Sequence, residues 1–305
     1  MMLWTRKFKN KADELPKYVI LLGQRTTMNR NFSIEGSSGT IHIGVSTKMY
    51  LGYQASLRWL EQARDVIEAR PSLRAGGPVD VFVIPSFPVL ESARRILDGL
   101  PVRLGAQNCS WGDGPLTGEV SAGMLAEMGV SLVEIGHAER RSLFGEDDDV
   151  VARKVTAALA AGLTPVLCVG ESNRMAPEEA ARVCAEQVDA ARLDRDGQVR
   201  VGEGPILVAY EPLWSIGAPA PADPEYVNQV VAALRAALPE SIAADIAIIY
   251  GGAAGPALLD RLPTVDGLFL GRFAHDPANL GTVIDEALAS IGPRARHPPG
   301  SSLPS

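Results

Sequence analysis

The sequence has few of the residues that structural metals, disulfides and nucleic acids require. Its 305 residues include three cysteines, Cys109, Cys168 and Cys184, and none is spaced for a metal site or a disulfide framework. Basic residues are outnumbered, since 29 Lys and Arg against 36 Asp and Glu give a net charge of −7. This balance argues against a nucleic-acid-binding surface. We therefore expect no bound metal and no nucleic-acid partner.

Long hydrophobic runs are also missing. The longest one near the start, residues 18–22, is too short for the apolar core of a signal peptide, and no stretch could span a bilayer. Hydrophobic residues nevertheless make up 46% of the chain, which is ordinary for a globular protein with a large core. We expect a cytoplasmic protein with no membrane partner.

The two ends differ in composition from the middle. Residues 1–39 are mixed and polar with no sustained period, which indicates a disordered extension or a wrongly chosen start, since Met28 offers a later one. Residues 293–305 are rich in proline and serine and are predicted to be a disordered tail. Residues 40–292 are left as one catalytic domain.

Short apolar runs and helical patterns alternate through this domain. Eight runs are typical of buried parallel strands: 41–45, 79–84, 102–106, 131–135, 164–169, 206–209, 246–250 and 267–270. Helical patterns lie between them, at 54–69, 148–161, 178–191, 223–238 and 277–291. The alternation predicts an α/β fold, a single-domain (β/α)₈ TIM barrel. A doubly wound open sheet is the rival, but residues 44–48 (GVSTK) lack its glycine fingerprint.

Charged residues follow three of the predicted strands, where barrels carry their function. Lys48 follows the first strand and could neutralise an anionic substrate, although a solvated surface lysine is the simpler interpretation. His137 follows the fourth and could exchange hydrogen bonds with a substrate oxygen, or be structural. Glu139 could pair with Lys48 or with an arginine. Glu211 follows the sixth strand directly.

The residues around Glu211 indicate that its carboxylate acts as a base. Burial beside Trp214 and Ile216 would disfavour the charged carboxylate and raise its pKa toward neutral pH. Residues 218–222 (APAPA) predict a loop with stiff ends that closes as a lid. Cys168, inside a strand, is interpreted as a packing residue.

Glycines follow the last two predicted strands, at Gly251, Gly252 and Gly271, and Arg272 comes next. Backbone N–H groups can approach an anion there, which is the usual phosphate position in barrels. An anion site, a neutral electrophile, a carboxylate base and a lid suit proton abstraction beside a carbonyl of a small phosphorylated substrate.

Five motifs then stand out in order along the chain: GAQNCSW with LTGEVS (105–121), EIGHAERR (134–141), PVLCVGE (165–171), AYEPLWSIG (209–217) and YGG (250–252). With these motifs the chain resembles the triose-phosphate isomerase family over residues 41–291. The resemblance implies a (β/α)₈ barrel isomerase that needs no cofactor. It also implies a homodimer, because residues 108–121 resemble the loop that docks into a neighbouring subunit.

The resemblance also implies roles for individual residues. It makes Glu211 the base, His137 the neutral electrophile, Lys48 the cation that stabilises an enediolate, and Glu139 the carboxylate that supports them. It implies that Tyr250 latches the closed lid. The predicted substrate-binding residues are Ser46, Lys48, Gly217, Tyr250, Gly251, Gly252, Gly271 and Arg272.

Several positions depart from the family pattern. Ser46 stands where the family has a substrate-binding asparagine, and Thr47 and Tyr50 also differ from its first motif. Pro219 replaces a lid glycine, and Arg272 replaces a glycine beside the phosphate site. Residues 44–46 (GVS) and 270–272 (LGR) resemble the branch that acts on L-erythrulose 1-phosphate.

The leading prediction is therefore an isomerase that converts L-erythrulose 1-phosphate to D-erythrulose 4-phosphate. Triose-phosphate isomerase itself, which interconverts dihydroxyacetone phosphate and D-glyceraldehyde 3-phosphate in glycolysis and gluconeogenesis, stays open. So does a non-catalytic homologue that binds a phosphorylated ligand.

Overall fold

All eight predicted strands are present in the computed structural model, which describes residues 39–192, 198–199, 204–216 and 222–294. No predicted strand end is wrong by more than one residue. The strands are β1 (Ile41–Ser46), β2 (Val79–Ile84), β3 (Val102–Ala106), β4 (Leu132–Ile135), β5 (Thr164–Val169), β6 (Ile206–Tyr210), β7 (Ile246–Tyr250) and β8 (Gly267–Leu270).

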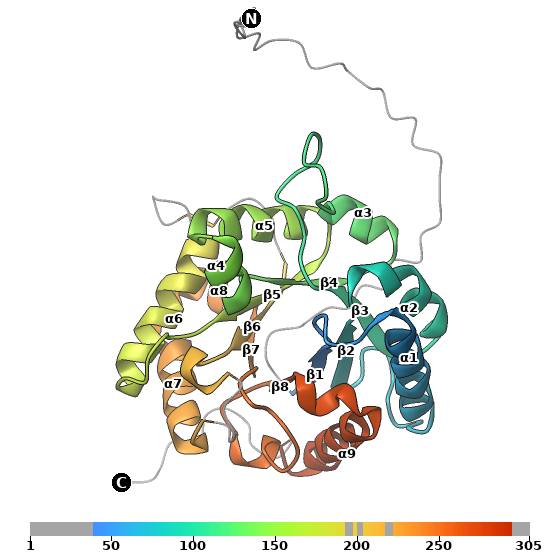
Figure 1. The fold of residues 1–305 in the computed structure, drawn as a ribbon. Helices are drawn as coiled ribbons and strands as arrows, with labels where there is room; N and C mark the ends of the chain where they lie inside the picture. The colour runs from blue at the N-terminus through green and yellow to red at the C-terminus, as the bar shows by residue number, and fades with distance from the viewer. Residues whose placement is uncertain (1–38, 193–197, 200–203, 217–221, 295–305) are drawn as a thin grey trace, which may run out of the picture. The chain divides into compact units, whose positions relative to one another are not determined.

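The strands form a closed parallel barrel in chain order. β1 pairs with β2 on one side, where Ile41 faces Val79, and with β8 on the other, where His42 faces Gly267. Because every strand has two neighbours, the doubly wound open sheet is excluded. The carboxyl ends of all eight strands meet at one end of the barrel (Figure 1).

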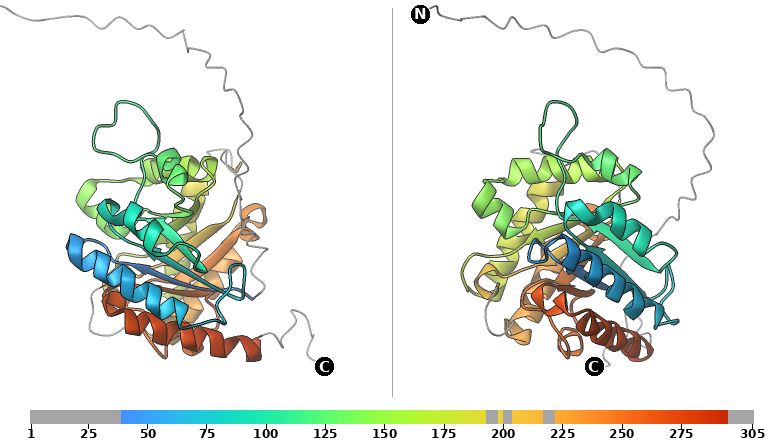
Figure 2. Two further views of the ribbon diagram at one scale, coloured as in Figure 1. Left: turned by 90° about the vertical axis from the view of Figure 1, so that its right-hand side faces the viewer. Right: turned by 45° about the vertical axis from the view of Figure 1, so that its right-hand side comes forward.

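The five predicted helices are confirmed on the outside of the barrel. They are α1 (Tyr53–Glu68), α5 (Asp148–Ala160), α6 (Pro177–Arg192), α7 (Pro224–Ala237) and α9 (Pro277–Arg294). α1 and α9 lie side by side (Figures 1 and 2). α7 begins as its sequence indicates, with Pro224 in the first turn and the Asp223 side chain accepting from the Glu225 backbone N–H at 3.0 Å.

The short helices were not predicted. They are α2 (Leu90–Ile96), α3 (Ala122–Glu127), α4 (Ala138–Phe144) and α8 (Glu240–Ala243), with 3₁₀ turns η1 (Phe87–Val89), η2 (Leu213–Ser215), η3 (Leu259–Arg261) and η4 (Arg272–His275). Segments this short show no clear hydrophobic period. α4 ends at Gly145, whose φ of 69° is the left-handed conformation that stops a helix.

The barrel interior is filled by apolar side chains. Gly44 makes this possible, because a Cβ there would lie 2.0 Å from the Phe82 ring. Cys168 is 2% exposed within this cluster, so its predicted packing role is confirmed. The cluster consists of Phe82, Ile84, Leu132, Val166, Cys168, Leu207, Ala209, Ala247, Ile249 and Phe269. Polar groups are therefore left to the two ends of the barrel.

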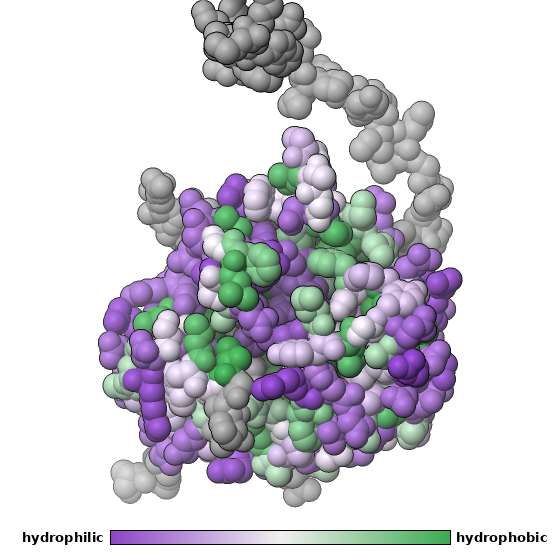
Figure 3. All heavy atoms as spheres, in the orientation of Figure 1, coloured by the Kyte–Doolittle hydropathy of each residue, from purple (hydrophilic) through white to green (hydrophobic). Residues whose placement is uncertain are grey.

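The predicted extension and tail lie almost wholly outside the described residues. α9 continues three residues beyond its predicted end at Ile291, so the predicted tail starts two residues too early. Among the described residues, no helix is long and apolar enough to cross a membrane. The face seen in Figure 3 is mostly hydrophilic, with small groups of hydrophobic residues.

Candidate active site

A cavity of about 320 Å³ opens at the carboxyl ends of the strands. Most of the predicted site residues line it, together with Glu134 and Ile216. They are Ser46, Lys48, His137, Glu139, Glu211, Gly251, Gly252, Gly271 and Arg272. Gly217, another predicted substrate-binding residue, lies outside the described residues. Tyr250 is not among the residues that line the cavity.

Lys48 is placed by a strained backbone. Its φ of 48° is left-handed, which for a lysine costs about 1–3 kcal/mol and persists only where neighbours enforce it. Its carbonyl oxygen accepts hydrogen bonds from Ser86 Oγ at 2.7 Å and Gln107 Nε2 at 2.9 Å. Ser86 and Gln107 thus hold the cation in place. Neither was predicted, although Gln107 belongs to one of the five motifs.

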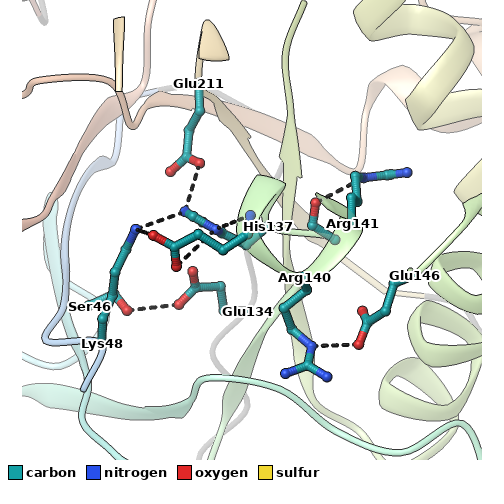
Figure 4. A network of polar contacts seen from close by, with 10 residues as sticks. Ser46, Lys48, Glu134, His137, Arg140, Arg141, Glu146 and Glu211 are labelled. Carbon is teal, nitrogen blue, oxygen red and sulfur yellow. Dashed lines mark hydrogen bonds and ion pairs between the residues drawn. The ribbon is translucent and has the colours of Figure 1, made fainter. Parts of the chain in front are cut away.

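The Lys48 ammonium joins the other charged groups (Figure 4). It donates to Glu139 Oε1 at 2.7 Å and lies 3.2 Å from His137 Nε2. The predicted pairing of Glu139 with Lys48 is therefore confirmed. Burial opposes the charge of Lys48, but Glu139 and the nearby carboxyl groups outweigh it and raise the pKa of Lys48. The amine is therefore charged at neutral pH.

His137 is held as a neutral ring. It is the N-cap of α4, and its Nδ1 accepts the Glu139 backbone N–H at 3.1 Å. A backbone amide can only donate, so Nδ1 carries no hydrogen and the ring proton is on Nε2, which faces the cavity. Burial, followed by the charge of Lys48, lowers the pKa of His137 to about 4. The imidazole therefore offers an N–H donor without a positive charge.

Glu211 lies on the other side of this ring. Its Oε2 is 3.3 Å from His137 Nε2, and the residue is 4% exposed. Burial, followed by the nearby Glu134, raises the pKa of Glu211 to about 8, although Lys48 opposes the shift. The predicted rise in basicity is confirmed. Of the two predicted neighbours, Ile216 lines the same cavity, whereas Trp214 donates to Glu171 Oε1 at 2.7 Å.

The glycines after β7 make room for neighbouring side chains. A Cβ on Gly251 would lie 2.5 Å from Glu211 Oε1, and one on Gly252 would lie 2.3 Å from the Tyr250 hydroxyl. At Gly271, by contrast, a Cβ would meet nothing within 4 Å. The first two glycines are therefore needed for packing as well as for any contact with an anion.

Tyr250 is fully buried, and its hydroxyl accepts the Ala222 backbone N–H at 3.2 Å. Ala222 is the last residue of the predicted lid. The hydroxyl also bonds to Ser215, on the other side of the lid. This position suits the predicted latch, whereas Tyr250 is absent from the residues that line the cavity.

Glu134 is the acidic residue that sequence reasoning missed. It is 4% exposed, lines the cavity and accepts from Ser46 Oγ at 2.8 Å (Figure 4). The strand period could have found it, because Leu132, two residues earlier, points into the barrel, and Glu134 therefore points inward as well. Burial raises the pKa of Glu134 to about 7.

Comparison with known proteins identifies the family. The model of the triosephosphate isomerase family matches residues 41–287. The chain belongs to the triosephosphate isomerase family. It is a sugar phosphate isomerase of that family.

Two curated relatives cover most of this isomerase. It is 46% identical to the L-erythrulose-1-phosphate isomerase of Pectobacterium atrosepticum, over 82% of this chain and 97% of the relative. It is 40% identical to the triosephosphate isomerase of Hahella chejuensis, over 79% of this chain and 98% of the relative.

A solved structure agrees with the fold. The triosephosphate isomerase of Bartonella henselae matches with a TM-score of 0.65 and 30% identity, over 80% of this chain and 98% of that one. Among the described residues, no group of histidine, cysteine and acidic side chains could hold a metal ion.

Proposed function

We propose that this isomerase converts L-erythrulose 1-phosphate to D-erythrulose 4-phosphate. The observation that supports isomerase chemistry most strongly is the meeting of three groups in one cavity. His137 Nε2 lies 3.2 Å from Lys48 Nζ and 3.3 Å from Glu211 Oε2. A carboxylate base therefore stands beside two hydrogen-bond donors, which is the arrangement that proton transfer next to a carbonyl requires.

The proton transfer proceeds in two steps. Glu211 removes the proton from C3 of the ketose, and the electron pair moves onto the carbonyl oxygen at C2. Lys48 and the Nε2–H of His137 stabilise the oxyanion of the resulting enediolate. Glu211 then returns the proton to C2 while the carbonyl forms at C3. Proton transfers between the two substrate oxygens, which His137 can carry, balance the reaction.

Two features support a four-carbon substrate. The 46% identical relative is named L-erythrulose-1-phosphate isomerase, as is a 37% identical relative from Rhizobium etli. Ser46, which lines the cavity, also has a shorter side chain than the asparagine that the family pattern has there. The 40% identical triosephosphate isomerase supports the second candidate, the three-carbon reaction.

The test is direct conversion. We expect the purified full-length protein to convert L-erythrulose 1-phosphate to D-erythrulose 4-phosphate with no added metal or coenzyme, as followed by NMR. Failure to convert this ketose while dihydroxyacetone phosphate reacts would favour the second candidate. Failure to convert either substrate would favour a non-catalytic phosphate-binding protein.

Arg272 provides a test of the phosphate site. It lines the cavity beside Gly271, and among the described residues no acidic partner holds its guanidinium. We expect Arg272→Gly to raise KM for the phosphorylated substrate about tenfold, with a smaller change in kcat, because an exposed charge contributes mainly to binding. An unchanged KM in steady-state kinetics would place Arg272 outside the site.

We also infer a homodimer in the cytoplasm. Part of the segment between β3 and α3 stands away from the barrel in every view (Figures 1 and 2). Met49 and Tyr50, in the loop after β1, are 88% and 59% exposed. Exposed apolar loops beside a cavity suit a contact with a second subunit.

A further inference from the structure

Ser46 and Glu134 form a buried polar pair that lines the cavity, which we call the cavity floor, and that takes no part in the proton transfer. Glu134 accepts from Ser46 Oγ through Oε2, at 2.8 Å. Among the described residues, no donor reaches its other oxygen, Oε1. Because Glu134 lines the cavity, a bound substrate can supply such a donor.

The two members of this pair come from different sides of the barrel, since Ser46 is on β1, next to β8, and the Glu134 carboxyl group reaches across to it. The glycines proposed to hold phosphate follow β7 and β8, whereas Glu134 is on β4, on the opposite side of the closed barrel from β8. Lys48, His137 and Glu211 line the space between. A ketose held by its phosphate at β7 and β8 therefore directs its other end toward Glu134.

We propose that Glu134, held by Ser46, binds the terminal hydroxyl group of the four-carbon substrate and so sets the preference for that substrate over a three-carbon one. This inference rests on the proposed function. The three-carbon substrate ends at the reacting carbon, so it has no group that reaches the floor. The fourth carbon, attached to C3, adds a hydroxymethyl group on the side away from the phosphate.

Charge requires Glu134 to be neutral in the complex. A carboxylate beside an anionic substrate is repelled, and burial already raises its pKa to about 7, which a bound phosphate raises further. A neutral carboxyl group can donate to a hydroxyl group as well as accept from it, whereas a carboxylate can only accept. The charged or titratable groups around Glu134 are Lys48, Glu139, Arg140, Cys168 and Glu211.

The test compares kcat/KM for L-erythrulose 1-phosphate with kcat/KM for dihydroxyacetone phosphate, expressed as a ratio. The ratio cancels effects on Glu211 that both substrates share. We expect Glu134→Leu to lower the ratio about 10- to 100-fold, because the terminal hydroxyl loses its partner. Glu134→Gln, which keeps a donor and an acceptor, is expected to stay within about threefold of the original ratio.

The pH dependence of this ratio shows whether Glu134 binds the substrate or only supports the structure of the cavity. In the unaltered protein the ratio is expected to fall as the pH rises above about 7, because the neutral carboxyl group is lost. In Glu134→Gln the ratio is expected to be independent of pH. Glu186→Leu, on the exposed face of α6, serves as the matched control and is expected to leave the ratio unchanged.

The results for Glu134→Leu and Ser46→Ala show whether Glu134 sets the substrate preference. A folded Glu134→Leu protein with an unchanged ratio would overturn it and leave the proposed function intact. If that variant does not fold, Ser46→Ala takes its place, and a ratio that falls by less than twofold overturns the inference. An unaltered protein that converts only the triose phosphate overturns the proposed function and the inference together.

Discussion

Glu211→Gln is expected to lower kcat about 10²- to 10⁴-fold, which is the contribution that a positioned general base makes to proton transfer. The amide keeps the shape of the side chain but cannot take the proton. Because Lys48 and the glycines after β7 are untouched, binding of a phosphorylated ligand is expected to survive. Steady-state kinetics and calorimetric binding of inorganic phosphate measure the two effects.

The same variant is expected to be more stable above neutral pH. The pKa of Glu211 is about 8 in the folded protein, against an ordinary value of 4.5, so folding favours the protonated form. Stability from this group is present below pH 4.5 and is lost as the pH rises toward 8. Glutamine does not titrate, so Glu211→Gln does not lose this stability. Its melting temperature is expected to exceed that of the unaltered protein by a few degrees at pH 8, and by less at pH 5.

Glu186→Gln is the matched control for this variant. Glu186 lies on the exposed surface of α6, in an i,i+4 pair with Arg182. It is expected to change kcat less than twofold and the melting temperature little. Full activity of Glu211→Gln would remove Glu211 from the reaction and would favour another base in the cavity.

Lys48→Met is expected to lower kcat/KM about 10²- to 10³-fold, the effect of removing one stabilising donor from a developing oxyanion. The Nζ of Lys48 is within 3.2 Å of His137, so its charge acts where the enediolate oxygen forms. Methionine keeps the length of the stem and faces the same backbone cost at φ 48°. The loss of kcat/KM is therefore expected to come from the missing charge and not from a change in the fold.

The pH profile of kcat/KM for Lys48→Met tests whether the ammonium group acts on Glu211. Lys48 opposes the rise in the pKa of Glu211, so its loss is expected to move the acid limb of kcat/KM to higher pH. Arg58→Met, which removes an exposed charge from α1, is the control and is expected to leave the limb in place. An unchanged limb in Lys48→Met would show that the ammonium does not act on Glu211.

The elements predicted best are those that parallel barrels bury on both faces. Such strands read as continuous apolar runs, so 79–84 and 164–169 could be found with both ends right. α4 could not be found, because its seven residues include only two large apolar side chains, and those, Leu143 and Phe144, are exposed. Yet this short helix fixes the tautomer of His137, because the Glu139 backbone N–H in its first turn donates to Nδ1.

The sequence predicted which residues form the site better than it predicted how they are positioned. Position at strand ends and the family motifs were enough to bring Lys48, His137 and Glu211 together. The left-handed backbone of Lys48 could not be read from its neighbours, because Ser86 and Gln107, which hold it, come from other strand ends. Glu134 is not found by looking at residues that follow strands, because it is the last inward position within β4.

The proposed substrate preference is tested most directly by the ratio of kcat/KM for L-erythrulose 1-phosphate to that for dihydroxyacetone phosphate, measured side by side on the unaltered protein. We expect the four-carbon ketose to be preferred by at least tenfold at neutral pH, since only it has a hydroxyl group that can bind Glu134. Preference for the three-carbon substrate would contradict this proposal and would make Ser46, Glu134 and Arg272 tolerated changes in a triosephosphate isomerase.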